Sequence, residues 1–312
     1  MLWNKLFLII LLSSLGSYIS GQPKVAITID DVPNARKFER DNFQTKLLDQ
    51  LDSMKIPVAV FINEGMIYKT KSAAKNFGLL DQWVKRDYTT LGNHTFSHSR
   101  YSGVGYEKFT TDIERGEAIT RELSKLHKKQ LSYFRFPYND LGNSLRQKQR
   151  IEAFLKENKY VPVPFTIESS DWAFNYLYEY YLMNNNKREA KRIADSYLDI
   201  TLEFFHYFDS LAAEQYGRHI SQIYLCHDNS LNADCLGVLV RKLKERSYSF
   251  VSLDEALEDK VYKQKNNYDK KWGISWFYRW MTDKAELKRL KKGEPDVSGM
   301  FKEYKRIHRL VK

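Results

Sequence analysis

The stretch VAITIDD, residues 25–31, decides the fold of this 312-residue chain. A short β-branched run that ends in two aspartates is typical of a buried strand with polar side chains at its carboxyl end. The run VAVFI at residues 58–62 has the same character, and helical patterns separate it from its neighbours. Strands that alternate with helices indicate repeated βα units around a parallel sheet. The working residues of such folds gather at the carboxyl ends of the strands.

The same alternation extends over most of residues 22–260 and organises the chain as one α/β unit. We expect further strands ending at 93 and over 133–136, 160–167, 223–226 and 249–253, with helices over 41–54, 78–86, 106–127, 144–158 and 236–246. Residues 175–213 interrupt the pattern and predict a helical insertion, broken around 184–186, that covers one side of the cleft. The tail 261–312 is basic and aromatic, and its first part is expected to pack on the barrel.

The amino-terminal residues 1–21 have the composition of a secretory signal. Lys5 precedes an apolar run over 6–12, and small residues at 19–21 suit a cleavage site. The alternative is an uncleaved anchor, but the run is shorter than the roughly 20 residues that cross a bilayer. We therefore expect a secreted or periplasmic protein.

The charge of the chain indicates which macromolecules it can bind, and its two cysteines raise the question of a disulfide. The chain has a net charge of +11, and residues 260–312 hold 16 Lys and Arg against 6 Asp and Glu. This tail suits attraction to an anionic envelope surface, although a solvated helical surface is the simpler interpretation. No nucleic-acid-binding pattern is present, so no nucleic-acid partner is expected. Cys226 and Cys235 are interpreted as buried thiols, with a disulfide across a small loop as the alternative.

Five short segments place chemically active side chains where strands should end. They are TIDD at 28–31, HTFSH at 94–98, RFPY at 135–138, SDW at 170–172 and LCHD at 225–228. Asp31, His94 and His98 can supply three ligands for one divalent metal, with a position left open for water. We expect one helical turn to point both imidazoles at that metal. The same ligands suit non-haem iron, so they do not by themselves separate an oxygenase from a hydrolase.

The order and spacing of these five segments resemble the polysaccharide deacetylases of carbohydrate esterase family four, the NodB-type homology domain. The resemblance runs from about residue 25 to residue 257. It implies a distorted (β/α) barrel of about seven parallel strands. It also implies a hydrolase that removes acetyl groups with a divalent metal, zinc in most members.

The resemblance assigns the metal ligands and the two proton carriers. Asp31, His94 and His98 match the ligands of the family. Asp30 resembles its general base, and His227 resembles the general acid that protonates the departing amine.

The resemblance also assigns supporting roles. Arg135 and Asp171 would orient and tune the base and the acid. The backbone N–H of Tyr138 would help to hold the oxyanion, and Trp172 and Leu225 would line the pocket for the acetyl methyl group.

Three departures from the family pattern concern the substrate more than the chemistry. Val32 and Asn139 stand where glycine is common, and Glu168 stands where aspartate is common. The expected activity is N-deacetylation of an amino-sugar polymer such as peptidoglycan or another envelope glycan. The alternatives are an O-acetyl polysaccharide esterase of the acetylxylan type and a non-catalytic glycan-binding protein. The last is disfavoured because every catalytic position is present.

Overall fold

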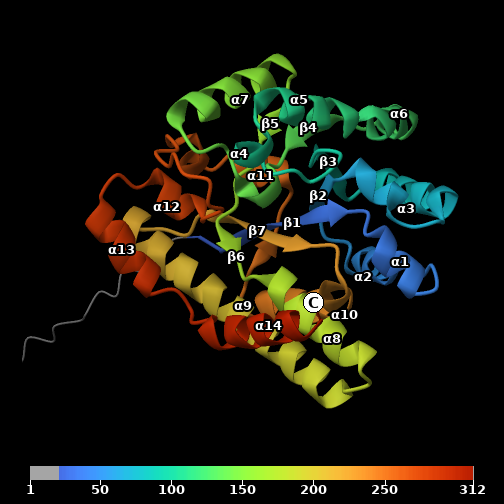
Figure 1. Ribbon diagram of the computed structural model, residues 1–312. Helices are drawn as coiled ribbons and strands as arrows, with labels where there is room; N and C mark the ends of the chain where they lie inside the picture. The colour runs from blue at the N-terminus through green and yellow to red at the C-terminus, as the bar shows by residue number, and fades with distance from the viewer. Residues whose placement is uncertain (1–20, 312) are drawn as a thin grey trace, which may run out of the picture.

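The structure, a computed structural model, describes residues 21–311 (Figure 1). The predicted signal peptide, residues 1–21, lies outside the described residues apart from Gly21. Among the helices of residues 21–311, none is both long enough and apolar enough to cross a membrane.

A curved sheet of parallel strands forms the centre of the molecule, which confirms the predicted distorted (β/α) barrel. Its strands are β1 (Lys24–Val32), β2 (Val58–Ile62), β3 (Thr89–Asn93), β4 (Leu131–Phe134), β5 (Val161–Pro162), β6 (Ile167–Glu168), β7 (Ser221–His227) and β8 (Ser249–Phe250). Seven strands follow one another in the order β5-β4-β3-β2-β1-β7-β6, and β8 pairs with β1. The strand that carries residues 25–31 therefore lies inside the sheet, between β2 and β7.

The two edges of the sheet are joined by one crossing segment. The prediction of a single strand over 160–167 is wrong, because β5 pairs with β4 while β6 pairs with β7 at the opposite edge. Between them, Val163 N donates to Phe134 O over 2.8 Å and Thr166 N donates to Ile223 O over 2.9 Å. Pro164 has no N–H to donate, so a continuous strand is disfavoured at this point. The segment 163–166 thus spans the gap between the two edges of the curled sheet.

Helices cover the outside of the sheet. They are α1 (Ala35–Arg40), α2 (Lys46–Met54), α3 (Ala73–Lys85), α4 (Tyr101–Val104), α5 (Tyr106–Arg115), α6 (Ala118–Leu126), α7 (Leu145–Glu157), α10 (Ser230–Glu245) and α11 (Leu253–Leu257), with 3₁₀ turns η1 (Glu64–Lys69), η2 (Pro137–Asn139) and η3 (Lys260–Lys263). The predicted helix over 106–127 is two helices, interrupted at Gly116. The buried carboxylate of Glu64 accepts from Ile119 N and Thr120 N at the start of α6, which compensates the unpaired amides of a new helix start.

The insertion forms two helices, α8 (Asp171–Met183) and α9 (Lys187–Tyr216), which separate at 184–186 as predicted. The two helices pack on each other and on α10. In Figure 1 they lie together at the bottom of the view, beside α14 (Ser298–Val311).

The carboxyl-terminal residues contact the barrel at segment 163–166. Ser275 Oγ donates to Thr166 O over 2.6 Å, and Trp276 N donates to Phe165 O over 3.0 Å. The chain continues through α12 (Trp276–Trp280) and α13 (Lys284–Lys292) to α14, which packs against α8.

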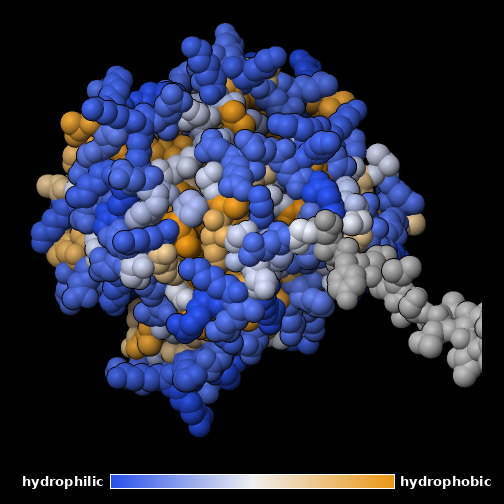
Figure 2. Space-filling model, turned by 180° about the vertical axis from the view of Figure 1, so that it is seen from behind, coloured by the Kyte–Doolittle hydropathy of each residue, from blue (hydrophilic) through white to orange (hydrophobic). Residues whose placement is uncertain are grey.

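Apolar side chains fill both faces of the sheet. Val25, Ile27 and Ile29 belong to a large cluster between the strands and the helices, whereas Ala26 belongs to a smaller one inside the barrel. This alternation follows from the two-residue period of a strand. Cys226 and Cys235 are buried free thiols, as the sequence favoured. Figure 2 shows the face turned away in Figure 1, where hydrophilic residues dominate and apolar residues show near the middle.

Candidate active site

A pocket of about 640 Å³ opens at the carboxyl ends of the strands and collects most of the predicted site residues. Eight of the ten line it: Asp30, Asp31, His94, His98, Tyr138, Trp172, Leu225 and His227. The other two, Arg135 and Asp171, are fully buried behind its wall. The structure therefore separates side chains that can reach a substrate from side chains that support them.

Both carboxylates of the aspartate pair face the same histidine. His94 Nε2 lies 3.7 Å from Asp30 Oδ2 and 3.8 Å from Asp31 Oδ1. Neighbouring side chains on a regular strand point in opposite directions, but these two carboxylates converge on His94. Asp31 has a φ of 61°, and the register of β1 shifts between Ile29 and Val32. Such a bulge re-aims side chains at the end of a strand.

The two histidines converge through an irregular loop rather than the predicted helical turn. Thr95 and His98 have φ values of 65° and 56°, and residues 94–98 form no helix. His98 Nε2 nevertheless lies 3.5 Å from Asp31 Oδ1. One ligand atom from each of Asp31, His94 and His98 lies within 4.8 Å of the others.

Two glycines and an asparagine hold this loop. A Cβ on Gly65 would overlap Phe96 O, and one on Gly116 would lie 2.5 Å from Phe96 N. The side-chain amide of Asn63 donates to Thr95 O over 3.0 Å and also to the carbonyl of His94. No sequence pattern marks these three residues, because their contacts with the loop form only in the folded chain.

The chemistry of the three ligands fits a divalent metal. His94 Nδ1 donates to Arg135 O over 2.7 Å, which leaves the Nε2 lone pair directed toward Asp31. Burial lowers the pKa of His94 to about 4, so its imidazole is neutral. Burial alone would raise the pKa of Asp31, but the nearby histidines, His98 foremost, lower it. A carboxylate with two imidazoles is a set that zinc and similar cations accept.

Arg135 supports Asp30 from inside the barrel. Its Nη1 lies 3.5 Å from Asp30 Oδ1, and its guanidinium lies 4.4 Å from the centre of the Phe61 ring. Its Nη2 donates to Thr28 Oγ1 and Pro164 O over 3.1 and 3.3 Å. Burial lowers the pKa of Arg135, and the charge of Asp30 opposes that shift. Asp30 therefore has a cationic neighbour that no substrate contacts.

His227 and Asp171 form a second centre in the same pocket. His227 Nδ1 donates to Asp171 Oδ1 over 2.7 Å, and His227 N donates to Asp171 Oδ2 over 2.9 Å. Asp171 Oδ2 also accepts from the side-chain amides of Asn229 and Asn232, over 2.9 and 2.6 Å. Burial alone would lower the pKa of His227, but Asp171 raises it to about 10. Asn229 and Asn232 had no motif to mark them.

Tyr138 occupies a tight turn between two other side chains. Tyr138 and Asn139 have φ values of 58° and 49°, so both adopt left-handed geometry, which asparagine tolerates better than most residues. The Tyr138 ring lies 4.6 Å from the His98 ring and 4.2 Å from the Arg100 guanidinium, measured to ring centres. Arg279 donates to Asn139 O over 2.8 Å. Neither arginine was identified from the sequence.

Trp172 and Leu225 line the apolar part of the pocket. The Trp172 side chain is 45% exposed, and its outer side contacts α14. Its ring centre lies 5.8 Å from that of Phe301 and 5.5 Å from that of Tyr304. The tail thus reaches the rim of the pocket.

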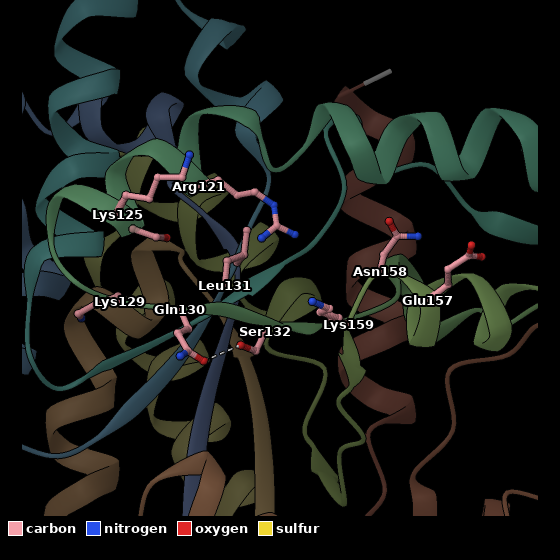
Figure 3. Close-up of a pocket in the computed structure, with 10 residues that line it drawn as sticks. Arg121, Lys125, Lys129, Gln130, Leu131, Ser132, Glu157, Asn158 and Lys159 are labelled. Atoms are coloured by element: carbon pink, nitrogen blue, oxygen red, sulfur yellow. Dashed lines mark hydrogen bonds between the residues drawn. The ribbon is translucent and has the colours of Figure 1, made fainter.

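A second hollow, of about 480 Å³, lies at the start of β4 and is basic (Figure 3). Arg121, Lys125, Lys129 and Lys159 are among its lining residues, which include Glu157 but no histidine. Lys129 Nζ donates to Thr89 O over 2.9 Å, so it is used within the fold. This hollow has no acid–base pair and is not a catalytic candidate.

Comparison with known proteins agrees with the geometry. The sequence profile of the polysaccharide deacetylase family matches residues 18–154, a little under half of the chain. A peptidoglycan-N-acetylglucosamine deacetylase from Bacillus cereus is 24% identical over 150 residues, which cover 48% of this chain and 46% of that protein. A putative polysaccharide deacetylase from Bacillus subtilis is 22% identical over 237 residues, 76% of this chain and 69% of that protein.

The fold is also similar to that of a solved structure. The crystal structure of a polysaccharide deacetylase from Bacillus cereus superposes with a TM-score of 0.50 at 16% identity, covering 74% of this chain and 92% of that one. The chain spans about half the length of the Bacillus cereus peptidoglycan deacetylase that it matches.

Proposed function

Since the chain belongs to the polysaccharide deacetylase family, we propose that it is a metal-dependent hydrolase that removes N-acetyl groups from an amino-sugar polymer. One observation carries this proposal. The pocket combines the ligands Asp31, His94 and His98 with two further proton carriers, Asp30 and His227, each supported by a buried partner of opposite charge.

A divalent cation held by Asp31, His94 and His98 would polarise the acetamide carbonyl and lower the pKa of a water molecule. Asp30 takes the proton of the attacking water, and Arg135 stabilises the ionised carboxylate that is ready to accept it. The backbone N–H of Tyr138, a residue that lines the pocket, would donate to the charge that develops on the carbonyl oxygen.

His227 completes the reaction by giving its proton to the departing nitrogen. An amine is a poor leaving group, so amide cleavage requires this proton more than ester cleavage does. Asp171 holds the imidazole by Nδ1 and keeps it protonated near neutral pH. This arrangement favours N-deacetylation over the O-acetyl esterase alternative.

Peptidoglycan or another envelope glycan is the proposed substrate class. Support comes from the Bacillus cereus relative, which is named a peptidoglycan-N-acetylglucosamine deacetylase. Trp172 and Leu225 would contact the acetyl methyl group at the wall of the pocket.

The test is acetate release from N-acetylglucosamine oligomers, peptidoglycan and acetylated xylan, with and without a chelator. We expect release from the first two, loss of release with chelator, and recovery on adding Zn²⁺. Asp30→Asn should lower kcat by about 10²–10⁴ while the bound metal is retained. Release from xylan alone would favour an O-acetyl esterase, and chelator-resistant release would contradict a metal mechanism. Equal behaviour of wild type and Asp30→Asn on all glycans would favour a binding protein.

We also propose that the protein is secreted and that its basic tail attracts it to an anionic envelope polymer. The basic residues of 260–312 other than the buried Arg279 support this, since exposed charges attract polyanions over a Debye length of about 8 Å at physiological salt. Co-sedimentation with an anionic wall polymer should decline between 0.05 and roughly 0.5 M salt. Salt-independent binding would contradict the proposal.

A further inference from the structure

A buried hydroxyl of the insertion reaches the support of the candidate acid. Tyr197 lies on α9 and has no exposed surface. Its hydroxyl donates to Asn232 Oδ1 over 2.7 Å and lies 2.8 Å from the Tyr224 hydroxyl. Burial holds the pKa of Tyr197 well above its usual value, so the hydroxyl stays protonated.

This hydrogen bond fixes the orientation of the Asn232 side chain. With Oδ1 bound to Tyr197, the Nδ2 group donates to Asp171 Oδ2 over 2.6 Å and to His227 O over 2.9 Å. A flipped amide would direct its oxygen at two acceptors and its nitrogen at a hydroxyl. The Tyr197 hydroxyl therefore selects the amide orientation that suits a charged Asp171.

The position of α9 shows that this helix does not line the pocket itself. Among the described residues that line the pocket, α8 supplies Trp172 and Asn175, and α9 supplies none. The predicted cover over one side of the cleft thus applies only to the first turns of α8. The contribution of α9 is made from behind the wall.

We propose that Tyr197 is a positioning residue for the general acid, acting through Asn232 and Asp171 on His227. The inference rests on the proposed function, because it assumes that His227 protonates the leaving group. It gives the second helix of the insertion a defined task, which is to keep the Asp171–His227 pair in working geometry.

The test compares an amide substrate with an activated ester in one preparation. N-acetylglucosamine oligomers need leaving-group protonation, whereas 4-nitrophenyl acetate releases a stable anion without it. Tyr197→Phe should lower kcat for the oligomer about tenfold, with KM unchanged and ester hydrolysis within about twofold of wild type. Tyr207→Phe is the matched control, since Tyr207 is also on α9 and donates its hydroxyl to Leu290 O over 2.6 Å. It should leave both rates unchanged.

Two further measurements separate the possible failures. If Tyr197 acts through Asn232, Tyr197→Phe should have no added effect in an Asn232→Ala background. His227→Ala should lose amide activity selectively; equal loss on both substrates would overturn the proposed acid role itself. A different result is that His227→Ala lowers amide hydrolysis selectively while Tyr197→Phe lowers amide and ester hydrolysis equally, or lowers neither. That result would overturn only the positioning role of Tyr197.

Discussion

The two sides of the pocket are held by different means. On the metal side, which comes from the first half of the chain, unusual backbone geometry aims the side chains. Asp31, Thr95 and His98 have positive φ, and Gly65 and Gly116 allow close backbone contact. On the acid side, which comes from the second half and contains Asp171 and His227, a network of side-chain hydrogen bonds aims the side chains.

This difference determines which substitutions disturb each side of the pocket. Backbone geometry is disturbed by adding atoms near the loop, even a single methyl group. A side-chain network is disturbed by removing one donor, even at a residue that no substrate touches. A substitution on one side of the pocket should therefore leave the geometry of the other side intact.

The largest effect is expected from Asp171→Asn on the acid side. Without the carboxylate charge, the pKa of His227 should fall from about 10, because burial then dominates. We expect kcat on N-acetyl oligomers to fall by about 10²–10⁴. The alkaline limb of the kcat/KM profile should move to lower pH, while Zn²⁺ affinity stays unchanged. An unmoved alkaline limb would contradict the assignment.

The free energy of unfolding of chelator-treated protein should also depend on the Asp171–His227 pair. The pKa of His227 in the fold, about 10, exceeds its ordinary value of 6.5, so its protonated form stabilises the folded state. This stabilisation is complete below about pH 6.5 and is lost as pH rises through 10. The difference in unfolding free energy between wild type and Asp171→Asn should shrink over that window. A constant difference would argue against the pair.

On the metal side, Gly116→Ala should weaken metal binding. The added Cβ would lie 2.5 Å from Phe96 N, so the loop that holds His94 and His98 must move. We expect Zn²⁺ affinity, measured by calorimetric titration, to fall about 10- to 100-fold. Gly78→Ala is the control, since nothing lies within 4 Å of its new methyl group. It should leave affinity unchanged and stabilise α3 by up to about 1 kcal/mol.

The sequence identified the candidate ligands and proton carriers on both sides but not the residues that support them, for a physical reason. Ligands and proton carriers must be specific residue types, so Asp30, His94 and His227 stand out at strand ends. The bulge at Asp31 and the loop at Thr95 depend on φ values that residue type alone does not determine. Partners such as Asn232 meet Asp171 only after folding, 61 residues along the chain. The prediction of a single strand over 160–167 is wrong because its two ends pair at opposite edges of the sheet, which depends on how the whole sheet curls.

Arg279, in the second half of the chain, contacts the Tyr138 turn in the first half, and its substitution tests whether it stabilises that turn. This buried guanidinium donates to Asn139 O and Trp272 O over 2.8 and 3.0 Å, beside the Tyr138 turn. Arg279→Gln should lower the unfolding free energy by about 2 kcal/mol in denaturant titrations, because buried carbonyls lose charged donors. Arg289→Gln, at an exposed arginine of α13, should change it by less than about 0.5 kcal/mol. Equal effects would remove Arg279 from the supports of the turn.

The smallest effect is expected at the rim, where the tail meets the acid side. Tyr304 packs edge-on against Trp172 with ring centres 5.5 Å apart, so it limits the orientations open to an indole that a sugar would contact. Aromatic pairs of this kind contribute about 0.5–1.5 kcal/mol. Tyr304→Ala should therefore raise KM for long oligomers about threefold and leave kcat unchanged, whereas the exposed neighbour Lys305→Ala should change neither. A fall in kcat instead would mean that α14 acts on the Asp171–His227 pair itself, and the side-chain network would then extend through Trp172 to the end of the chain.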